Sequence, residues 1–456
     1  MHYRRLIPLF ITVTLLSQAC KNTPQPNAYG EGLTKTTATV DDIDSLIAAM
    51  TLEEKMGMIH ASSSFTSGGV PRLGIPELIM SDGPHGVRHE HGRDWVPDDT
   101  DEDMNTYLPT GIALASTWNR ELGYRYGTVL GNEAKARGKH IILGPGLNII
   151  RSPLNGRNFE YLSEDPFLTA QMGTGYIQGV QAQGIATCVK HYVANNQETD
   201  RFTIDAIVSE RALREIYLPA FKAGVEADAW TFMGAYNLIN GQHATHHEYL
   251  INEVLKGEYG FGGAVISDWG AVNDTKEALI YGNDIEMGTD LSMLPNPNYD
   301  KFYTANAGIK MVNSGEVDET VIDDKVRRIL QVMFKTPALG NASGGALNAP
   351  EHQEIARKVA EEAVVLLKNE NNLLPLSREE IKTLAVIGHN ANRKFAERGG
   401  SSQVKALYEI TVLEGIQKLV GDGVEVVFAE GYQPNEKNQA DGALASEAIA
   451  VAENAD

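Results

Sequence analysis

This sequence contains very little cysteine. Cys20 and Cys188 are the only two among 456 residues, so disulfide bonds are not expected to hold the fold together. Cys188 stands in the apolar segment 186–189 and is expected to be a small buried side chain rather than a reactive thiol. Stability must therefore come from packing, and an apolar fraction of 42% is ordinary for a globular protein with a large core.

Positive charge is also scarce. The chain has 39 Lys and Arg side chains against 60 Asp and Glu side chains, which gives a formal net charge of -21. A surface of that sign repels nucleic acid and anionic membranes, so neither is expected as a partner. A neutral or cationic substrate is favoured.

The apolar run at the N-terminus, residues 6–16, is too short to span a bilayer comfortably. It follows Arg4 and Arg5, as the apolar region of a secretory signal peptide does. Ala19 directly before Cys20 resembles a bacterial lipoprotein processing site. The N-terminus is therefore interpreted as a targeting segment and not as part of the fold.

These features predict export. We expect a lipoprotein-type signal peptide over residues 1–20, a lipid on Cys20, and a polar tether over residues 21–39. The protein would then lie in the periplasm or at the cell surface, anchored to the outer membrane through that lipid alone. Ordinary signal cleavage near the same position is the alternative.

Motifs for cofactors and metals are missing as well. No phosphate-binding glycine pattern opens a helix, so no organic cofactor is expected. The histidines of "PHGVRHEHG" (84–92) have a spacing that suits no common metal site. The acidic run at 98–103 lacks the glycine and terminal glutamate of a calcium loop, so we expect it to be solvated and predict no bound metal.

The sequence does contain a regular alternation of helical and apolar segments. Residues 41–50 have helical spacing, and Thr51 with Glu54 forms a capping box. Strand-like runs and amphipathic helical stretches then alternate. The strand-like runs are at 77–83, 111–117, 140–149, 185–194, 230–236 and 263–269. The helical stretches are at 119–137, 167–183, 209–226, 248–257 and 272–281. This α/β pattern predicts a (β/α)8-type, TIM-like barrel over residues 40–335, with an open doubly wound sheet as the alternative.

The last part of the chain is predicted to open a second α/β domain. A helix at 319–334 is followed by a linker over 336–350, rich in Gly, Ala and Asn. Residues 351–456 contain a helix at 351–367, two strand-like runs around another helix, and a final helix at 441–454. Two strands alone rarely form a stable sheet, so we expect the N-terminal part of an incomplete, truncated α/β sandwich domain.

Polar residues end most of the strand-like runs of the predicted barrel. They are Asp82, Asn148, Lys190 with His191, Asn237, and Asp268 with Trp269. In a parallel barrel these C-terminal ends converge on one face, which is where such enzymes have their active sites. A protein built for stability alone has no reason to place polar residues there.

Asp268 is a candidate nucleophile, because it follows an apolar strand and Arg157, Lys190 and His191 could stabilise its charge. Spacing alone favours equally an ordinary N-cap for a helix beginning near Ala271. The two interpretations stay open at this point.

Lys190 and His191 end an apolar strand, where a lysine is costly to bury without partners. The pair could donate hydrogen bonds to ligand hydroxyls, Lys190 could be the Schiff-base lysine of a barrel aldolase, or it could form an ion pair at the barrel mouth. Arg157 offers a planar fork of donors suited to a diol. Tyr236 and Trp269 offer flat faces on which a sugar ring could stack.

Six segments occur in a distinctive order: "MTLEEKMG" (50–57), "RLGIPELIMSDGPHGVR" (72–88), "GPGLNIIRSPLNGRNFEYLSEDP" (144–166), "KHYVANNQE" (190–198), "MGAYNLING" (233–241) and "GAVISDWGAV" (263–272). Together they resemble glycoside hydrolase family 3, in its β-glucosidase group. A seventh, "AVVLLKNENNLLPL" (363–376), is similar to the start of that family's second domain. The resemblance runs from about residue 41 to 456.

The resemblance implies a retaining, exo-acting β-glucosidase that removes terminal non-reducing β-D-glucosyl residues from oligosaccharides or glycosides. Asp268 then matches the family's nucleophile, and Asp82 matches the carboxylate that holds the outer hydroxyls of the sugar. The other sugar-binding positions that it implies are Arg157, Lys190, His191, Tyr236, Trp269, Met233, Arg201 and Glu160.

One expected feature has no counterpart. The β-glucosidase branch carries its general acid/base, a glutamate, on the second domain, and no Glu of residues 351–456 stands in a matching context. The N-acetylglucosaminide branch uses a His-Asp pair after "KHFPGHGD", where this sequence has "KHYVANNQETD" (190–200). We therefore expect no acid/base residue in this chain.

Two alternatives accompany this interpretation. One is a β-xylosidase or α-arabinofuranosidase of the same family, and the other, from a different class, is a non-catalytic sugar-binding lipoprotein. The expected partner is a β-linked oligosaccharide or glycoside, and a homodimer is compatible with the sequence.

Overall fold

The computed structural model describes residues 40–456 apart from 89–103, 289–297, 340–343, 397–399 and 435–441. The predicted signal peptide, the lipid site at Cys20, the tether and the acidic run at 98–103 lie outside the described residues. Everything below belongs to the unit that comprises Lys35–Asp456.

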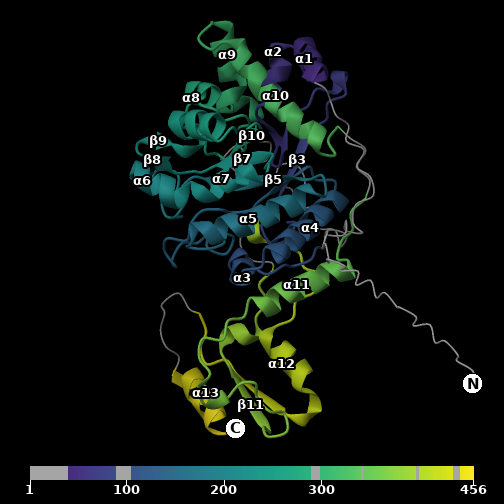
Figure 1. Ribbon diagram of the computed structural model, residues 1–456, viewed down its shortest axis with the longest axis vertical. Coiled ribbons are helices and arrows are strands. Elements are labelled where there is room, and N and C mark those ends of the chain that lie inside the picture. Colours follow the sequence, from purple (N-terminus) through teal and green to yellow (C-terminus); the bar gives the residue numbers. More distant parts are fainter. Residues whose placement is uncertain (1–39, 89–103, 289–297, 340–343, 397–399, 435–441) are drawn as a thin grey trace, which may run out of the picture. The chain divides into compact units, whose positions relative to one another are not determined.

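Five parallel strands form the centre of the fold (Figure 1). In sheet order they are β3 (Leu78–Asp82), β4 (Ile141–Leu143), β5 (Ala186–Tyr192), β7 (Thr231–Gly234) and β10 (Ala264–Ser267). Each pairs with its neighbour in parallel register, as helical crossovers require. The strands therefore point their C-terminal ends the same way.

The sheet continues past β3 and curls back toward β10. β2 (Thr66–Ser67) pairs antiparallel with β3, and β1 (Ala61–Ser63) pairs antiparallel with β2. Single parallel bridges, Ile266 with Ile285 and Glu286 with His60, carry the pairing from β10 back to the residue before β1. This ring is a (β/α)8-type barrel, as predicted, with one antiparallel strand.

Side chains of the strands divide between two apolar cores. Ile141, Leu143, Cys188 and Ile266 belong to the core that includes the barrel interior. Ile142, in contrast, packs with residues of the surrounding helices. Cys188 is buried, as predicted, and burial raises the pKa of its thiol to about 12, so the thiol is unreactive at neutral pH.

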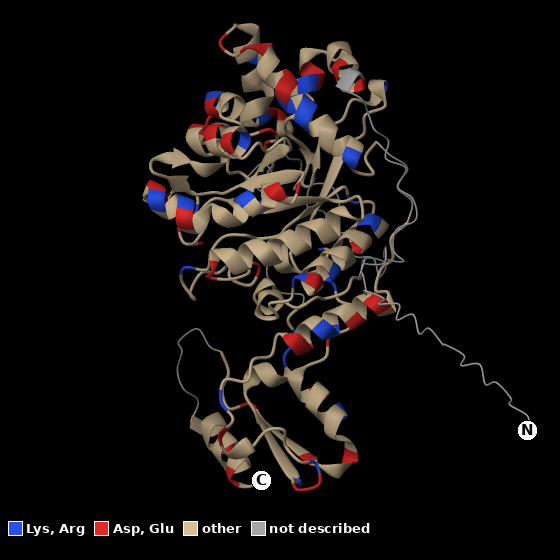
Figure 2. Ribbon diagram, in the orientation of Figure 1, with Lys and Arg blue, Asp and Glu red and all other residues tan. Residues whose placement is uncertain are grey.

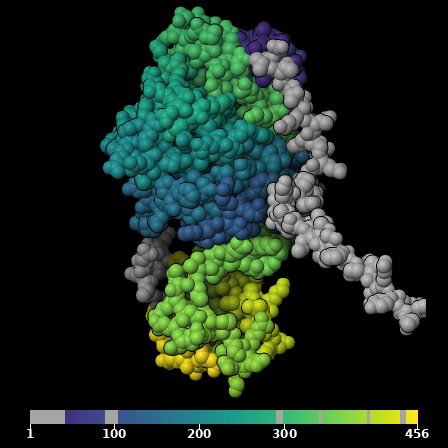
Figure 3. Space-filling model, in the orientation of Figure 1, coloured from purple at the N-terminus to yellow at the C-terminus, as the bar shows by residue number. Residues whose placement is uncertain are grey.

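Helices surround the strands and, in the space-filling view, hide them (Figure 3). The longer ones are α1 (Val40–Ala49), α4 (Arg120–Ala136), α5 (Pro166–Gln181), α7 (Pro219–Glu226), η6 (Glu248–Glu258) and α10 (Glu319–Lys335). Two glycines let α4 and α5 pack closely, since a Cβ at Gly127 would lie 2.2 Å from the Tyr176 carbonyl oxygen and one at Gly179 2.0 Å from that of Tyr124. Many of the charged residues lie on the helices (Figure 2).

Shorter elements complete the barrel. They include α2 (Leu52–Met58), α3 (Gly111–Ser116), α6 (Glu210–Ala212), η4 (Leu213–Tyr217), α8 (Thr275–Ile280), α9 (Gly308–Asn313), and the small sheet of β6 (Asp205–Ala206), β8 (Leu238–Ile239) and β9 (Gln242–His243). The capping box predicted for α2 is present, with Thr51 and Glu54 each bonding the backbone N–H of the other.

One local prediction was wrong, and one pair of strands was missed. The predicted strand at 111–117 is the helix α3, because a short apolar run does not distinguish a buried strand from a buried helix. The β1–β2 hairpin was missed, because its segment, Ala61 to Ser67, consists mostly of small polar residues rather than the apolar alternation of a typical strand.

The residues after α10 contain α11 (Pro350–Glu362), β11 (Thr383–Ile387), α12 (Val412–Val420), β12 (Glu425–Ala429) and α13 (Gly442–Glu453). β11 and β12 pair in parallel, so this is a second α/β arrangement. α11 ends earlier than predicted, and the following Val364 and Leu367 are 80% and 91% exposed. Among the described helices, none has the length and apolarity needed to cross a membrane.

Candidate active site

Asp268 follows β10 directly, at the C-terminal end of the parallel strands. Its side chain is only 9% exposed, and Oδ1 accepts a hydrogen bond from the backbone N–H of Trp269 at 2.8 Å. The alternative role as a helix cap is wrong, because the next helix, α8, begins later and is capped by Asp274. The buried carboxylate is thus left to face the barrel mouth.

A chain of charged and polar groups connects Asp268 to Asp82. His191 Nε2 lies 3.4 Å from Asp268 Oδ2 and 2.9 Å from a terminal nitrogen (Nη2) of Arg157. Arg157 Nε donates to Glu160. Lys190 Nζ then lies 3.1 Å from Glu160 Oε2 and 4.0 Å from Asp82 Oδ1. The structure therefore brings these six predicted residues together, from strands β3 and β5, the residue after β10, and the loop before α5.

Lys190 joins this network through ionic contacts of its ammonium group. Its side chain is 1% exposed, and its ammonium group faces two carboxylates, those of Glu160 and Asp82. This is the ion pair that the sequence left open beside the hydrogen-bonding and Schiff-base interpretations. A buried lysine held in this way orients the carboxylates around the mouth of the barrel.

Tyr236 and Arg201 form the side of the site next to β7. The guanidinium of Arg201 lies 4.3 Å from the centroid of the Tyr236 ring, a cation–π geometry. Glu198 connects the two arginines, with Oε2 2.7 Å from Arg201 and Oε1 3.6 Å from Arg157. These contacts hold the two guanidinium groups on the same side of the network.

Trp269 forms another side. Its indole Nε1 donates to the carbonyl of Ser64 at 2.7 Å, and its ring packs on Phe65 at a centroid distance of 5.2 Å. Met233 is 2% exposed and lies in the same apolar core against which Trp269 packs. The indole is therefore fixed by the β1–β2 turn, and Met233 lies among the apolar residues beneath the site.

Burial and neighbouring charges set the ionisation of the central groups. Burial raises the pKa of Asp268, while Arg157, the Tyr236 hydroxyl and Lys190 lower it less strongly. Burial and the same two cations hold the pKa of His191 well below its usual range, so this imidazole is neutral. Burial also opposes ionisation of Glu160, but Arg157 and Lys190 bring its pKa below the ordinary value.

Three residues of the site were missed. Arg88 Nη1 lies 3.0 Å from Asp82 Oδ2, Glu198 connects two arginines, and the Tyr161 hydroxyl lies 3.0 Å from His191 Nδ1. All three stand inside the distinctive segments, so proximity to predicted site residues was the available signal. Charge spacing alone does not reveal which loop residues turn inward.

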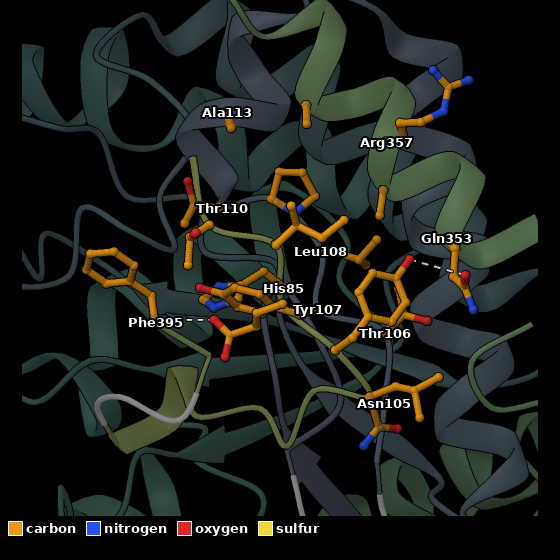
Figure 4. A pocket seen from close by; sticks show the side chains of 18 of the residues that line it. His85, Asn105, Thr106, Tyr107, Leu108, Thr110, Ala113, Gln353, Arg357 and Phe395 are labelled. Atoms are coloured by element: carbon orange, nitrogen blue, oxygen red, sulfur yellow. Dashed lines mark hydrogen bonds between the residues drawn. The ribbon is translucent and has the colours of Figure 1, made fainter. Parts of the chain in front are cut away.

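A separate set of residues lines a cavity of about 1030 Å³ (Figure 4). His85 lines it, with its ring 5.7 Å from that of Tyr107 and 5.8 Å from that of Phe159. Burial lowers the pKa of His85 to about 4, although the charge of Glu160 acts in the other direction. Its walls offer the aromatic edges and faces that sugar or aryl rings contact.

Two family models match this chain in sequence. The model for the glycosyl hydrolase family 3 N terminal domain matches residues 50–332, and that for the C-terminal domain matches residues 364–456. The chain belongs to glycoside hydrolase family 3. The order of the sequence segments had already indicated this family, and the (β/α)8 barrel followed by an α/β domain agrees with it.

Proteins similar in sequence match most of the length of this chain. Beta-glucosidase BoGH3A of Bacteroides ovatus is 48% identical over 400 residues, which cover 86% of this chain and 53% of that protein. An exo-alpha-(1->6)-L-arabinopyranosidase of Bifidobacterium longum is 37% identical over 416 residues, covering 89% of this chain and 53% of that protein. The chain thus spans about half the length of these relatives.

A solved structure has the same fold. Beta-glucosidase 3B from Thermotoga neapolitana, in complex with alpha-D-glucose, superimposes with a TM-score of 0.77 at 35% identity. The match covers 90% of this chain and 56% of that one. The similarity therefore extends over the barrel and into the α/β residues that follow it.

Proposed function

We propose that this family 3 glycoside hydrolase is a retaining, exo-acting β-glucosidase that removes terminal non-reducing β-D-glucosyl residues. The observation that carries the proposal is Asp268, a buried carboxylate at a strand end that faces His191 and Arg157. The β-glucosidase names of BoGH3A and of the Thermotoga neapolitana structure support the sugar.

In the first half of the reaction, Asp268 attacks the anomeric carbon of the sugar. The bond from Asp268 to that carbon forms as the bond to the leaving oxygen breaks, which gives a covalent glycosyl-enzyme. Oδ1 is held by the Trp269 N–H, so Oδ2, on the His191 side, is the attacking oxygen. Water then cleaves the ester, and the anomeric configuration is retained.

The remaining polar groups bind the sugar in this proposal. Asp82, held by Arg88 and Lys190, accepts hydrogen bonds from hydroxyls far from the reacting carbon. Trp269 and Tyr236 supply apolar faces for the ring. Glu160 is ion-paired with Arg157 and Lys190 and does not act as an acid. Within the described residues we therefore assign the glycosylation step to Asp268, and we assign the protonation of the leaving oxygen to none of them.

A second candidate function is the hydrolysis of glycosides of another sugar at the same site. The family relative named an arabinopyranosidase supports a pentose, and a β-xylosidase or α-arabinofuranosidase would differ by a pocket that excludes the hydroxymethyl group of glucose. A non-catalytic sugar-binding lipoprotein remains a distinct proposal, because it would bind glucose without forming an adduct. We also propose export and lipid anchoring at Cys20, which the N-terminal sequence supports.

The test is covalent trapping. An activated 2-deoxy-2-fluoro-β-glucoside needs no acid to expel its leaving group, so it reports on the nucleophile alone. We expect a hexosyl adduct on the peptide that contains Asp268 in mass spectrometry, and none in Asp268→Asn. Matched xyloside and arabinoside probes rank the sugars by rate. A folded chain that binds glucose but gives no adduct would contradict the hydrolase and favour the binding protein.

A further inference from the structure

The hydroxyl of Tyr161 lies at the centre of a buried hydrogen-bond network behind His191. The Tyr161 side chain is 0% exposed. Its oxygen lies 3.0 Å from His191 Nδ1 and 3.0 Å from the Asn195 carbonyl oxygen. Amide nitrogens of Asn148 and Asn195 lie 3.2 Å and 3.1 Å away. The phenol has one proton, so it can donate in only one of these contacts and must accept in the others.

The Tyr161 hydroxyl donates its proton in a hydrogen bond to the backbone carbonyl of Asn195. A backbone carbonyl can only accept, so the contact with the Asn195 carbonyl oxygen requires the phenol to donate. The amide of Asn148 is fixed independently, because its Nδ2 donates to the His191 carbonyl at 2.8 Å and its Oδ1 accepts from the Asn195 N–H at 3.3 Å. The phenol oxygen is therefore an acceptor for the amide nitrogens of Asn148 and Asn195 and for Nδ1–H of His191, and these three donors share its lone pairs.

The same tautomer satisfies the other side of the imidazole. Arg157 has only donors, and its Nη2 lies 2.9 Å from His191 Nε2, so this contact is a hydrogen bond only while Nε2 presents its lone pair. A neutral ring with its proton on Nδ1 satisfies both sides, and Nε2 then has no proton to offer Asp268 or a ligand. This differs from the sequence expectation that His191 donates to ligand hydroxyls.

We propose that Tyr161 is a positioning residue: its hydroxyl fixes His191 as the Nδ1–H tautomer, and His191 Nε2 thereby holds the guanidinium of Arg157 beside Asp268. Glu160 and Glu198 hold the other nitrogens of Arg157, so His191 supplies the third side of its support. The effect of this arrangement on the reaction rests on the proposed function, whereas the tautomer itself does not.

Several charged and titratable groups face His191 and Asp268. His191 faces Arg157, Lys190, Arg201, Tyr161 and Asp268, and Asp268 faces Arg157, Lys190, His191 and Tyr236. Arg157 opposes the rise in the pKa of Asp268 that burial causes. Loosening Arg157 therefore makes Asp268 harder to ionise and the nucleophile weaker in mild acid.

The first measurement is the ¹⁵N spectrum of the histidine rings in the whole chain at neutral pH, with the His191 signals assigned from their loss in His191→Gln. We expect a protonated Nδ1 and an unprotonated Nε2 in the wild type. In Tyr161→Phe we expect this pattern to be lost, with Nε2–H appearing. Tyr192→Phe is the matched control, because it removes another fully buried hydroxyl, one that donates to the Leu250 carbonyl at 2.8 Å.

A wild-type spectrum with Nε2–H would overturn the proposal without any variant, as would a Tyr161→Phe spectrum identical to wild type. The second measurement is the pH dependence of trapping by the fluoroglucoside. We expect the acidic limb of Tyr161→Phe to move upward by about one pH unit, and that of Tyr192→Phe to stay. An unmoved limb in Tyr161→Phe refutes the link to Asp268. If the wild type shows no trapping at all, the proposed function fails, and the spectra still decide the tautomer.

Discussion

At the scale of single residues, Asp268 shows how function opposes stability. Burial raises the pKa of its carboxyl above the ordinary value of 3.8, although Arg157, Tyr236 and Lys190 act in the other direction. A carboxyl with a raised pKa in the fold destabilises the folded state wherever it is ionised. The penalty is fully present above the folded pKa and disappears as the pH falls to the unfolded value.

Asp268→Asn should therefore stabilise the folded chain at pH 7, by about 1 kcal/mol. Thermal unfolding measured from pH 7 down to acid should show this gain shrinking as the wild-type Asp268 takes up its proton. Asp274→Asn is the control, because Asn caps α8 as well as Asp does and should change little. A destabilised Asp268→Asn at pH 7 would show that its ion pairs outweigh its burial.

The residues at strand ends could be predicted because their position depends on pattern alone. Asp82, Lys190, His191 and Asp268 each follow or end an apolar run, so the barrel necessarily brings them to one face. Glu198 could not be predicted in this way. It lies in a loop after β5, and only the three-dimensional course of that loop turns it between two arginines.

At the scale of secondary-structure elements, local chemistry predicted where α2 begins. The Thr51 hydroxyl accepts from the Glu54 N–H at 3.3 Å, and Glu54 accepts from the Thr51 N–H at 2.9 Å. Glu54 also pairs with Arg72. The start of α2 is thus fixed by bonds between neighbours in sequence, which is why the pattern was sufficient.

Thr51→Ala should lower the free energy of unfolding by about 1 kcal/mol, because the N–H of Glu54 loses its acceptor. Urea unfolding of the barrel measures this loss. Thr320→Ala is the comparison: Thr320 lies in the first turn of α10, but Asp318 caps that helix through the backbone N–H of residue 320, so the change should stay within about 0.5 kcal/mol. Equal effects of the two substitutions would refute the role of the capping box.

At the scale of the whole molecule, the number of βα units predicted a barrel, but not how it closes. The bridges from β10 to the segment before β1 involve Ile285, Glu286 and His60. None of these stands in a strand-like run, and the burial that brings them together comes from contacts between distant parts of the chain. Closure is therefore a tertiary property, which single-sequence patterns do not show.

Net charge acts on the molecule as a whole. With a formal net charge of -21, the chain should repel anionic substrates over the range of its electrostatic field. We expect an aryl β-glucoside that carries a sulfonate to have a lower kcat/KM than its neutral counterpart at about 0.01 M salt, where the Debye length is about 30 Å. The ratio should approach one as salt rises toward about 1 M. A ratio that salt does not change would place the discrimination in direct contacts instead.

The β1–β2 hairpin has a practical consequence for enzyme engineers. In an all-parallel barrel, the loops that face the substrate each lead from a strand to a helix, and libraries are cut at those junctions. Here one wall depends on Ser64 and Phe65, a tight turn between two strands that supports Trp269. Exchanging loops at strand–helix junctions would leave that turn unaltered. For the proposed glucosidase, a library that varies contacts to the group attached to the sugar should include this turn, and the short length of the turn is then a constraint on the design.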